Sequence, residues 1–238
     1  MWSLMGSPRC SEMTRASTSR TSGDKKIVGR IYRKLFSFYG CRDWWPGDSP
    51  FEVAVGAILT QNTNWANVEK AIANLKHHRA LSAKALHEMP IQDIASLIRP
   101  SGYYNVKAKR LKAFIGFLMA AYEGDMALMA GTSTERLRVD LLAINGVGQE
   151  TADSILLYAL NRPVFVIDAY TKRVFSRHGI MDVRAGYEEC QNLFHGSMQA
   201  DTAVYNEYHA LIVSVGKEFC RPAPRCARCP LEKIPHDC

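Results

Sequence analysis

Residues 141–173 read LLAINGVGQETADSILLYALNRPVFVIDAYTKR. This stretch begins at the end of one helix with apolar periodicity, breaks at residues 145–148 and resumes as a second helix through Ala159. The break contains two glycines one residue apart, Gly146 and Gly148, which we expect to let the backbone turn sharply. The N–H groups at the start of a helix lack partners and attract anions. The stretch therefore predicts a hairpin between two helices that binds phosphate.

Asp168 lies twenty residues after Gly148, where the apolar run 164–167 ends and another helix is expected to begin. A carboxylate at this position is well placed to cap the N-terminus of that helix. A second interpretation is a catalytic carboxylate next to a hairpin that grips phosphate. The residues alone leave both interpretations open.

The composition of the chain is that of a protein that folds without outside help. Its positive charge favours a polyanionic partner. Hydrophobic residues make up 47% of the 238 residues, and the formal net charge is +7 at pH 7. No run of 18 or more apolar residues occurs, so we expect no membrane span. Residues 1–23 are rich in Ser, Thr, Met and Arg and lack the amphipathic stripe of a transit peptide, so we expect a flexible tail.

Caps, breakers and apolar spacing predict helices throughout the rest of the chain and no sheet. The one strand-like run, residues 163–167, is short and isolated. Residues 124–131 read as a linker, and the expected helix 103–122 carries basic residues that are either a solvated face or a contact to DNA backbone. These basic residues are Lys107, Lys109, Arg110 and Lys112. The other expected helices are 25–39, 50–60, 66–77, 82–89, 91–98, 187–198 and 201–219.

The frame around Asp168 is I-D-x-x-x-x-R-V, from Ile167 to Val174. Together with the preceding hairpin, it closely resembles the helix-hairpin-helix DNA glycosylases of the endonuclease III superfamily. The resemblance extends over residues 25–238 and implies an all-α fold with two helical domains flanking a DNA-binding cleft. It implies a helical barrel with the helix-hairpin-helix at 49–162 and a discontinuous iron–sulfur cluster domain at 24–48 and 163–238. The cleft is expected to hold Asp168, Trp45 and Trp65.

Four of the seven cysteines crowd the C-terminus in the spacing C-x5-C-x2-C-x8-C, at Cys220, Cys226, Cys229 and Cys238. Four thiolates in so short a segment can hold zinc or an iron–sulfur cluster, and the spacing does not choose between them. The resemblance implies a [4Fe-4S] cluster in a structural role. The first gap is one residue shorter, and the last gap longer, than in the usual run of the superfamily.

The hairpin residues Asn145, Gly146, Val147 and Gly148 are expected to grip the DNA backbone, and Asp168 to stabilise a sugar cation or activate water. Members of the superfamily that also cut the strand carry a lysine just after the hairpin. Glu150 stands in that place. A carboxylate cannot form the Schiff base, so we predict a monofunctional glycosylase in which Glu150 is a first-turn helix acid near the DNA rather than a second catalyst.

Within the superfamily, the chain most resembles the bacterial 3-methyladenine DNA glycosylases. The resemblance implies that Trp44, Trp45, Pro46 and Trp65 enclose the flipped base, although buried tryptophans can also simply staple a loop. An electron-rich ring attracts a cationic N-alkylated purine. Lys217 resembles a pocket lysine or contacts phosphate, and Gln61 either caps a helix end or fills the gap left in the duplex.

We therefore expect a monomeric enzyme that removes alkylated purines such as 3-methyladenine from double-stranded DNA, without AP lyase activity. The expected location is the bacterial cytoplasm, at the nucleoid. One alternative is an endonuclease III-like or mismatch glycosylase acting on oxidised or mispaired bases. The other is a non-catalytic helix-hairpin-helix protein that only binds DNA.

Overall fold

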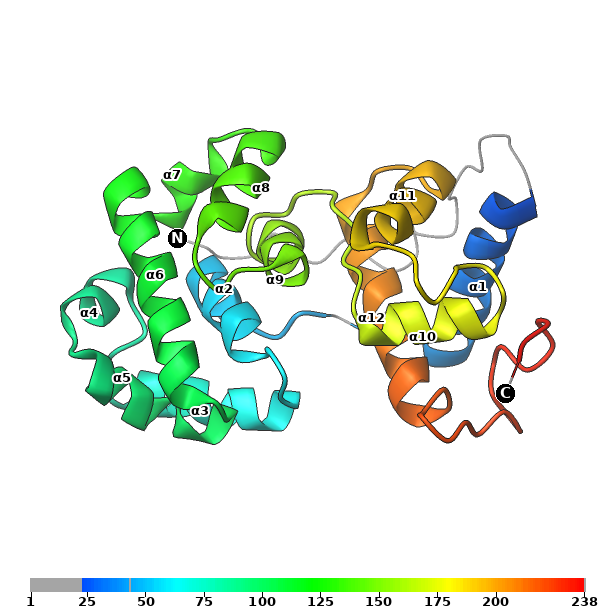
Figure 1. Cartoon of the computed structure of the whole chain (residues 1–238), viewed down its shortest axis with the longest axis horizontal. Coiled ribbons are helices and arrows are strands. Elements are labelled where there is room, and N and C mark those ends of the chain that lie inside the picture. Colours follow the sequence, from blue (N-terminus) through cyan, green and yellow to red (C-terminus); the bar gives the residue numbers. More distant parts are fainter. Residues whose placement is uncertain (1–22, 43, 238) are drawn as a thin grey trace. The chain divides into compact units, whose positions relative to one another are not determined.

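The computed structural model describes residues 23–42 and 44–237, and all regular elements in these two ranges are helical (Figure 1). The predicted all-α fold class is confirmed. The predicted tail, apart from residue 23, and the predicted ligand Cys238 lie outside the described residues. Among the helices that are described, none combines the length and apolarity needed to cross a membrane.

The chain divides into two compact units. One is the continuous stretch Pro46–Arg162, and the other joins residues up to Trp45 with those from Pro163 onward. The sequence-based limits, 49–162 against 24–48 with 163–238, remain a prediction about which parts fold as domains.

The continuous unit is organised around α2 (Pro50–Leu59), which is apolar on all sides and almost wholly buried. This helix packs against α3, α6, α9 and the π-helical turn η3. The elements that follow α2 are α3 (Trp65–His77), α4 (Ala83–Glu88), α5 (Ile91–Leu97), η2 (Arg99–Ser101), α6 (Tyr104–Tyr122), α7 (Met126–Ala130), α8 (Thr134–Ala143), α9 (Gln149–Ser154) and η3 (Ile155–Ala159).

Local signals account for where α2 begins. Ser49 is the N-cap, its hydroxyl accepts from the Glu52 N–H at 3.2 Å, and Pro50 occupies the first turn, as expected. The Glu52 carboxylate accepts from the N–H of Asp48, one residue before the position that a capping box uses. It also pairs with Lys76 at 2.7 Å, which ties the start of α2 to α3.

Two features of this unit differ from the expectations. The predicted linker contains α7, because Asp125 caps a helical turn whose Met126 and Met129 are buried. Lys107 does not belong to an exposed basic face, since it is 1% exposed and shares the buried face of α6 with Leu111. Its ammonium donates to the carbonyl of Leu59 at 2.9 Å and to that of Ser101 at 2.6 Å.

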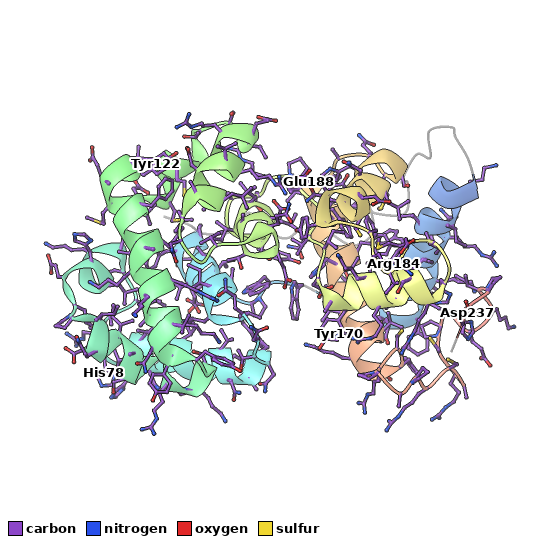
Figure 2. The ribbon with its side chains drawn as sticks, in the orientation of Figure 1. His78, Tyr122, Tyr170, Arg184, Glu188 and Asp237 are labelled. Carbon is purple, nitrogen blue, oxygen red and sulfur yellow. The ribbon has the colours of Figure 1, made fainter. Side chains whose placement is uncertain are left out.

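The second unit contains α1 (Gly23–Tyr39), α10 (Ala169–Arg177), α11 (Tyr187–Ser197) and α12 (Thr202–Glu218). Helix α12 is its centre and packs against α1 and α10, which Figure 1 shows beside it. Gly216 permits the close approach of α10, because a Cβ there would lie 2.6 Å from Cδ1 of Tyr170, a residue labelled in Figure 2.

Residues 164–167 of the extended run are buried, yet the run has no strand partner in the described chain. Side chains of α11 take the place of a neighbouring strand. The Phe165 N–H donates to His195 at 3.0 Å, the Phe165 carbonyl accepts from Gln191 at 2.7 Å, and the Ile167 N–H donates to Tyr187 at 3.3 Å. Because these bonds satisfy buried backbone groups, the run is held rigidly up to Asp168.

Candidate active site

The hairpin between α8 and α9 has one glycine that its backbone needs. Gly146 has φ +86°, and a Cβ at this residue would collide with the side chain of Arg110, whose Cδ would be 2.7 Å away. Gly148 has φ −91°, and a Cβ there would meet no atom within 4 Å. The expectation that both glycines serve the turn is therefore right for Gly146 and wrong for Gly148, which leaves the start of α9 open.

Gln61 ties the end of α2 to this hairpin. Its amide nitrogen donates to the Gly146 carbonyl at 3.0 Å and to the Thr151 hydroxyl at 2.9 Å. Its amide oxygen accepts from the guanidinium of Arg110. The interpretation of Gln61 as a helix-end cap is therefore wrong, because the side chain bonds to the hairpin and not to the last turn of α2.

The two acids of α9 have different environments. Glu150 is exposed in the first turn, at the position where the strand-cutting members carry a lysine. Asp153 is fully buried and forms an ion pair with Arg138 at 2.8 Å, which braces α8 against α9. Of these two acids, Glu150 is the one at the surface of the hairpin.

Asp168 is the N-cap of α10. Its Oδ1 accepts from the Thr171 N–H at 2.7 Å and from the Thr171 hydroxyl at 2.8 Å. Its Oδ2 lies 3.6 Å from Nε2 of His209 on α12. Burial raises the pKa of Asp168, but the His209 charge and the hydrogen bonds outweigh burial and hold the pKa below its usual range. Asp168 is thus an anion at neutral pH.

His209 is a residue that the sequence analysis missed. It lies on an apolar helix, 41 positions from Asp168, without a motif around it. The sequence around a single histidine in such a position does not predict which residue it contacts. Only the crossing of α10 and α12 brings the two side chains together.

Trp44, Trp45 and Lys217 form a cluster in the same unit as Asp168. The two indole rings meet edge to face, with centroids 5.7 Å apart, and Nζ of Lys217 lies 5.8 Å from the centroid of the Trp44 ring. Glu207 on α12 accepts from the Arg42 N–H at 2.9 Å, which anchors the preceding loop. Both tryptophans are half-buried, so they are not a fully covered staple.

Pro46 and Trp65 belong to the continuous unit. Pro46 is exposed, and Trp65 is the first residue of α3 rather than part of the break before it. The indole N–H of Trp65 donates to Glu69 at 2.9 Å. This bond holds the half-buried ring against the surface of α3.

Cys220, Cys226 and Cys229 line one pocket at the end of α12. Arg177 of α10 donates to the sulfur of Cys220 at 3.3 Å, and its carbonyl accepts from the N–H of Asp237, labelled in Figure 2. Three thiols around one pocket suit a thiolate-bound centre. Among residues 23–42 and 44–237, no three His, Cys, Asp or Glu side chains are arranged as metal ligands.

Comparison with known proteins identifies the class. A model of the HhH-GPD superfamily of base excision DNA repair proteins matches residues 55–199. A candidate DNA repair glycosylase of Methanocaldococcus jannaschii is 48% identical over 211 residues, which cover 88% of this chain and 96% of that protein. The H. pylori 3-methyladenine DNA glycosylase bound to 1,N6-ethenoadenine has a similar structure, with TM-score 0.68 and 27% identity over 82% of this chain and 97% of that one.

Endonuclease III, in a trapped covalent intermediate with DNA, gives a TM-score of 0.75 at 20% identity, covering 88% of this chain and 94% of that one. At this identity the similarity concerns the fold alone. The chain belongs to the HhH-GPD superfamily of base excision DNA repair proteins, so the predicted resemblance to the endonuclease III superfamily is confirmed. It is an enzyme of the DNA glycosylase class, and the alternative of a non-catalytic binder is set aside.

Proposed function

We propose that the protein is a monofunctional DNA glycosylase that removes alkylated purines, such as 3-methyladenine, from double-stranded DNA. The observation that carries the proposal is Glu150, an exposed carboxylate where a strand-cutting glycosylase needs an amine. Without that amine the sugar cannot be held as an imine. The product is then an abasic site in an unbroken strand.

Asp168 is the proposed catalytic carboxylate. The bond between the base nitrogen and C1′ breaks with its electron pair moving to the base, which leaves positive charge on the sugar. A carboxylate with a lowered pKa is a weak base but a permanent anion. Its role is therefore mainly to stabilise the sugar cation, while water adds its oxygen to C1′ and releases a proton to the solvent.

This division of labour suits an alkylated purine. Alkylation at a ring nitrogen makes the base cationic, so it leaves as a neutral molecule and needs little help from a general acid. We propose that Trp44, Trp45, Pro46 and Trp65 enclose the flipped base, with Lys217 lining the pocket. Stacking of a cation on an electron-rich ring is worth roughly 1–2 kcal/mol when water is excluded.

We propose that residues 145–148 contact the DNA backbone near the lesion. Gln61, beside them, fills the gap left in the duplex, and Glu150 lies near the DNA in the first turn of α9. The open start of α9 at Gly148 gives phosphate oxygens access to unpaired N–H groups. Such contacts do not depend on sequence, as a repair enzyme requires. Because one chain carries all of these residues, we propose that the protein acts as a monomer. We also propose that it acts in the bacterial cytoplasm, at the nucleoid.

We propose that Cys220, Cys226, Cys229 and Cys238 hold a [4Fe-4S] cluster. The pocket shared by Cys220, Cys226 and Cys229 and their soft thiolate donors support the proposal, as does the Arg177 contact, which places positive charge beside the sulfur of Cys220. When bound, the cluster would supply a covalent staple for a segment with little apolar core. The protein's own contribution is to hold the end of α12 through Arg173, which donates to the carbonyls of Cys220 and Gly216.

The deciding experiment is base release from methylated duplex DNA by the purified protein, with Asp168→Asn as the matched variant. We expect wild type to release 3-methyladenine and the variant to be slower by roughly 10²- to 10⁴-fold. Strand breaks should appear only after alkali.

Release of no alkylated base would contradict the proposed substrate. Strand cleavage without alkali, together with borohydride trapping of a protein–DNA adduct, would contradict the monofunctional mechanism. Oxidised-pyrimidine and mismatch duplexes, tested in parallel, would then identify the alternative substrate.

A further inference from the structure

His209 is a buried histidine that faces the proposed catalytic carboxylate. It is 5% exposed on α12, and its Nε2 lies 3.6 Å from Oδ2 of Asp168. The ring also lies edge-on to Phe165, with centroids 6.4 Å apart. The neighbours of His209 are thus an apolar ring on one side and a carboxylate on another.

The two oxygens of Asp168 have different partners. Both hydrogen bonds from Thr171 end on Oδ1, whereas Oδ2 is the oxygen nearest to His209. A carboxylate in an 11% exposed side chain would tend to take up a proton if nothing opposed burial. Without His209, the orientation of the carboxylate would also be fixed only by the hydrogen bonds to Oδ1. An imidazole at ion-pair distance addresses both problems.

We infer that His209 is a positioning residue that keeps the Asp168 carboxylate ionised and oriented toward the sugar. The inference rests on Asp168 being the catalytic carboxylate of the proposed function, but it does not depend on which base is removed. A histidine needed only for packing would be replaceable by leucine without effect on the carboxylate. A positioning histidine would not.

The first test needs no substrate. Carboxyl ¹³C NMR, with the Asp168 signal assigned from Asp168→Asn, follows the titration of this one group in the full chain. We expect His209→Leu to raise the pKa of Asp168 by about 1 or more, because an opposite charge at this range lowers a carboxyl pKa by roughly that amount. His209→Gln, which keeps an N–H donor, should give a smaller rise. An unchanged Asp168 titration in both variants would overturn the inference.

The second test separates chemistry from binding. In single-turnover base release, His209→Leu should be roughly tenfold slower than wild type at unchanged DNA Kd, with partial rescue by His209→Gln. Combined with Asp168→Asn, His209→Leu should cause no further loss, because it acts through the carboxylate. Tyr205→Phe alters another buried polar group of α12 one turn away and is the matched control, expected within twofold of wild type.

A further loss in the double variant, or a weaker DNA Kd with an unchanged rate, would overturn the inference. If wild type releases no alkylated base, the proposed substrate fails while the NMR titration still decides the role of His209. If His209→Leu does not fold, the His209→Gln titration and rate decide it alone.

Discussion

Lys107 carries a positive charge into the core of the continuous unit. Its two acceptors, the carbonyls of Leu59 and Ser101, are neutral, so neither acceptor offsets the positive charge. Burial, with a smaller contribution from the nearby charge of Arg110, lowers the pKa of Lys107 to about 8. The residue joins the end of α2 to η2 through an ammonium group that loses its proton at a lower pH than a lysine in water.

This pKa predicts a pH-dependent stability. Between about pH 8 and 10.5 the unfolded chain binds the Lys107 proton and the folded chain does not, so the free energy of unfolding rises with pH as the penalty for burying the charge is lost. Urea unfolding of wild type and Lys107→Met at pH 7.5 and 9.5 measures the effect. The free energy of unfolding of wild type relative to that of Lys107→Met should rise by about 2 kcal/mol between these two pH values. A constant difference would show that Lys107 keeps its proton in the core.

At the scale of the element, the hairpin combines a glycine at positive φ with one at ordinary backbone angles. Gly146 is in the left-handed region against Arg110, and the Gln61 amide holds its carbonyl. Gly148 begins α9 with ordinary angles and open space around it. The first glycine therefore serves the fold, and the second leaves room for whatever approaches the helix start.

The two glycines should respond differently to alanine. Gly146→Ala adds a Cβ at positive φ into an occupied space and should lower the free energy of unfolding by about 1–3 kcal/mol. Gly148→Ala, the matched control for stability, should stay within about 0.5 kcal/mol of wild type. It should nevertheless weaken DNA binding, measured by fluorescence anisotropy. Equal destabilisation by both substitutions would contradict this division.

At the scale of the whole molecule, α10 links the proposed catalytic carboxylate to the cysteine pocket. Asp168 caps its first turn, Arg173 donates to the Cys220 carbonyl at 2.6 Å, and Arg177 contacts the Cys220 sulfur. If the cysteine segment lost its order, the position of Asp168 would therefore change through α10 alone. We therefore expect disorder in the cysteine segment to lower activity through α10, without a chemical role for the cysteines.

The cysteine proposal predicts the metal content of the protein. Protein purified without air should contain iron and acid-labile sulfide at about four of each per chain and no stoichiometric zinc. Cys226→Ser should lose both and melt at a lower temperature. Cys190→Ser, a buried thiol outside the pocket, should retain both. Stoichiometric zinc without sulfide would contradict the cluster and favour a zinc site.

Local patterns were sufficient to predict most of the helices. The Ser49 and Asp168 caps, Pro50 in the first turn of α2 and the turn at Gly146 each depend on residues within a few positions. Such interactions can be predicted from the sequence, because a capping side chain and the N–H group that it binds are only about three positions apart. The frame from Ile167 to Val174 was likewise enough to recognise the superfamily.

The tertiary structure decided which side chains meet. Gln61 bonds to Gly146 across 85 positions, and His209 faces Asp168 across 41. Lys107 was predicted to lie on a basic surface because other basic residues stand close to it in the sequence. The packing of α6 buries it instead. The sequence by itself determined most of the helices, the hairpin, the candidate carboxylate and the class of enzyme. The hydrogen-bond partner of a buried polar group depends on which helices cross in the folded chain. A local sequence pattern does not reveal which helices these are.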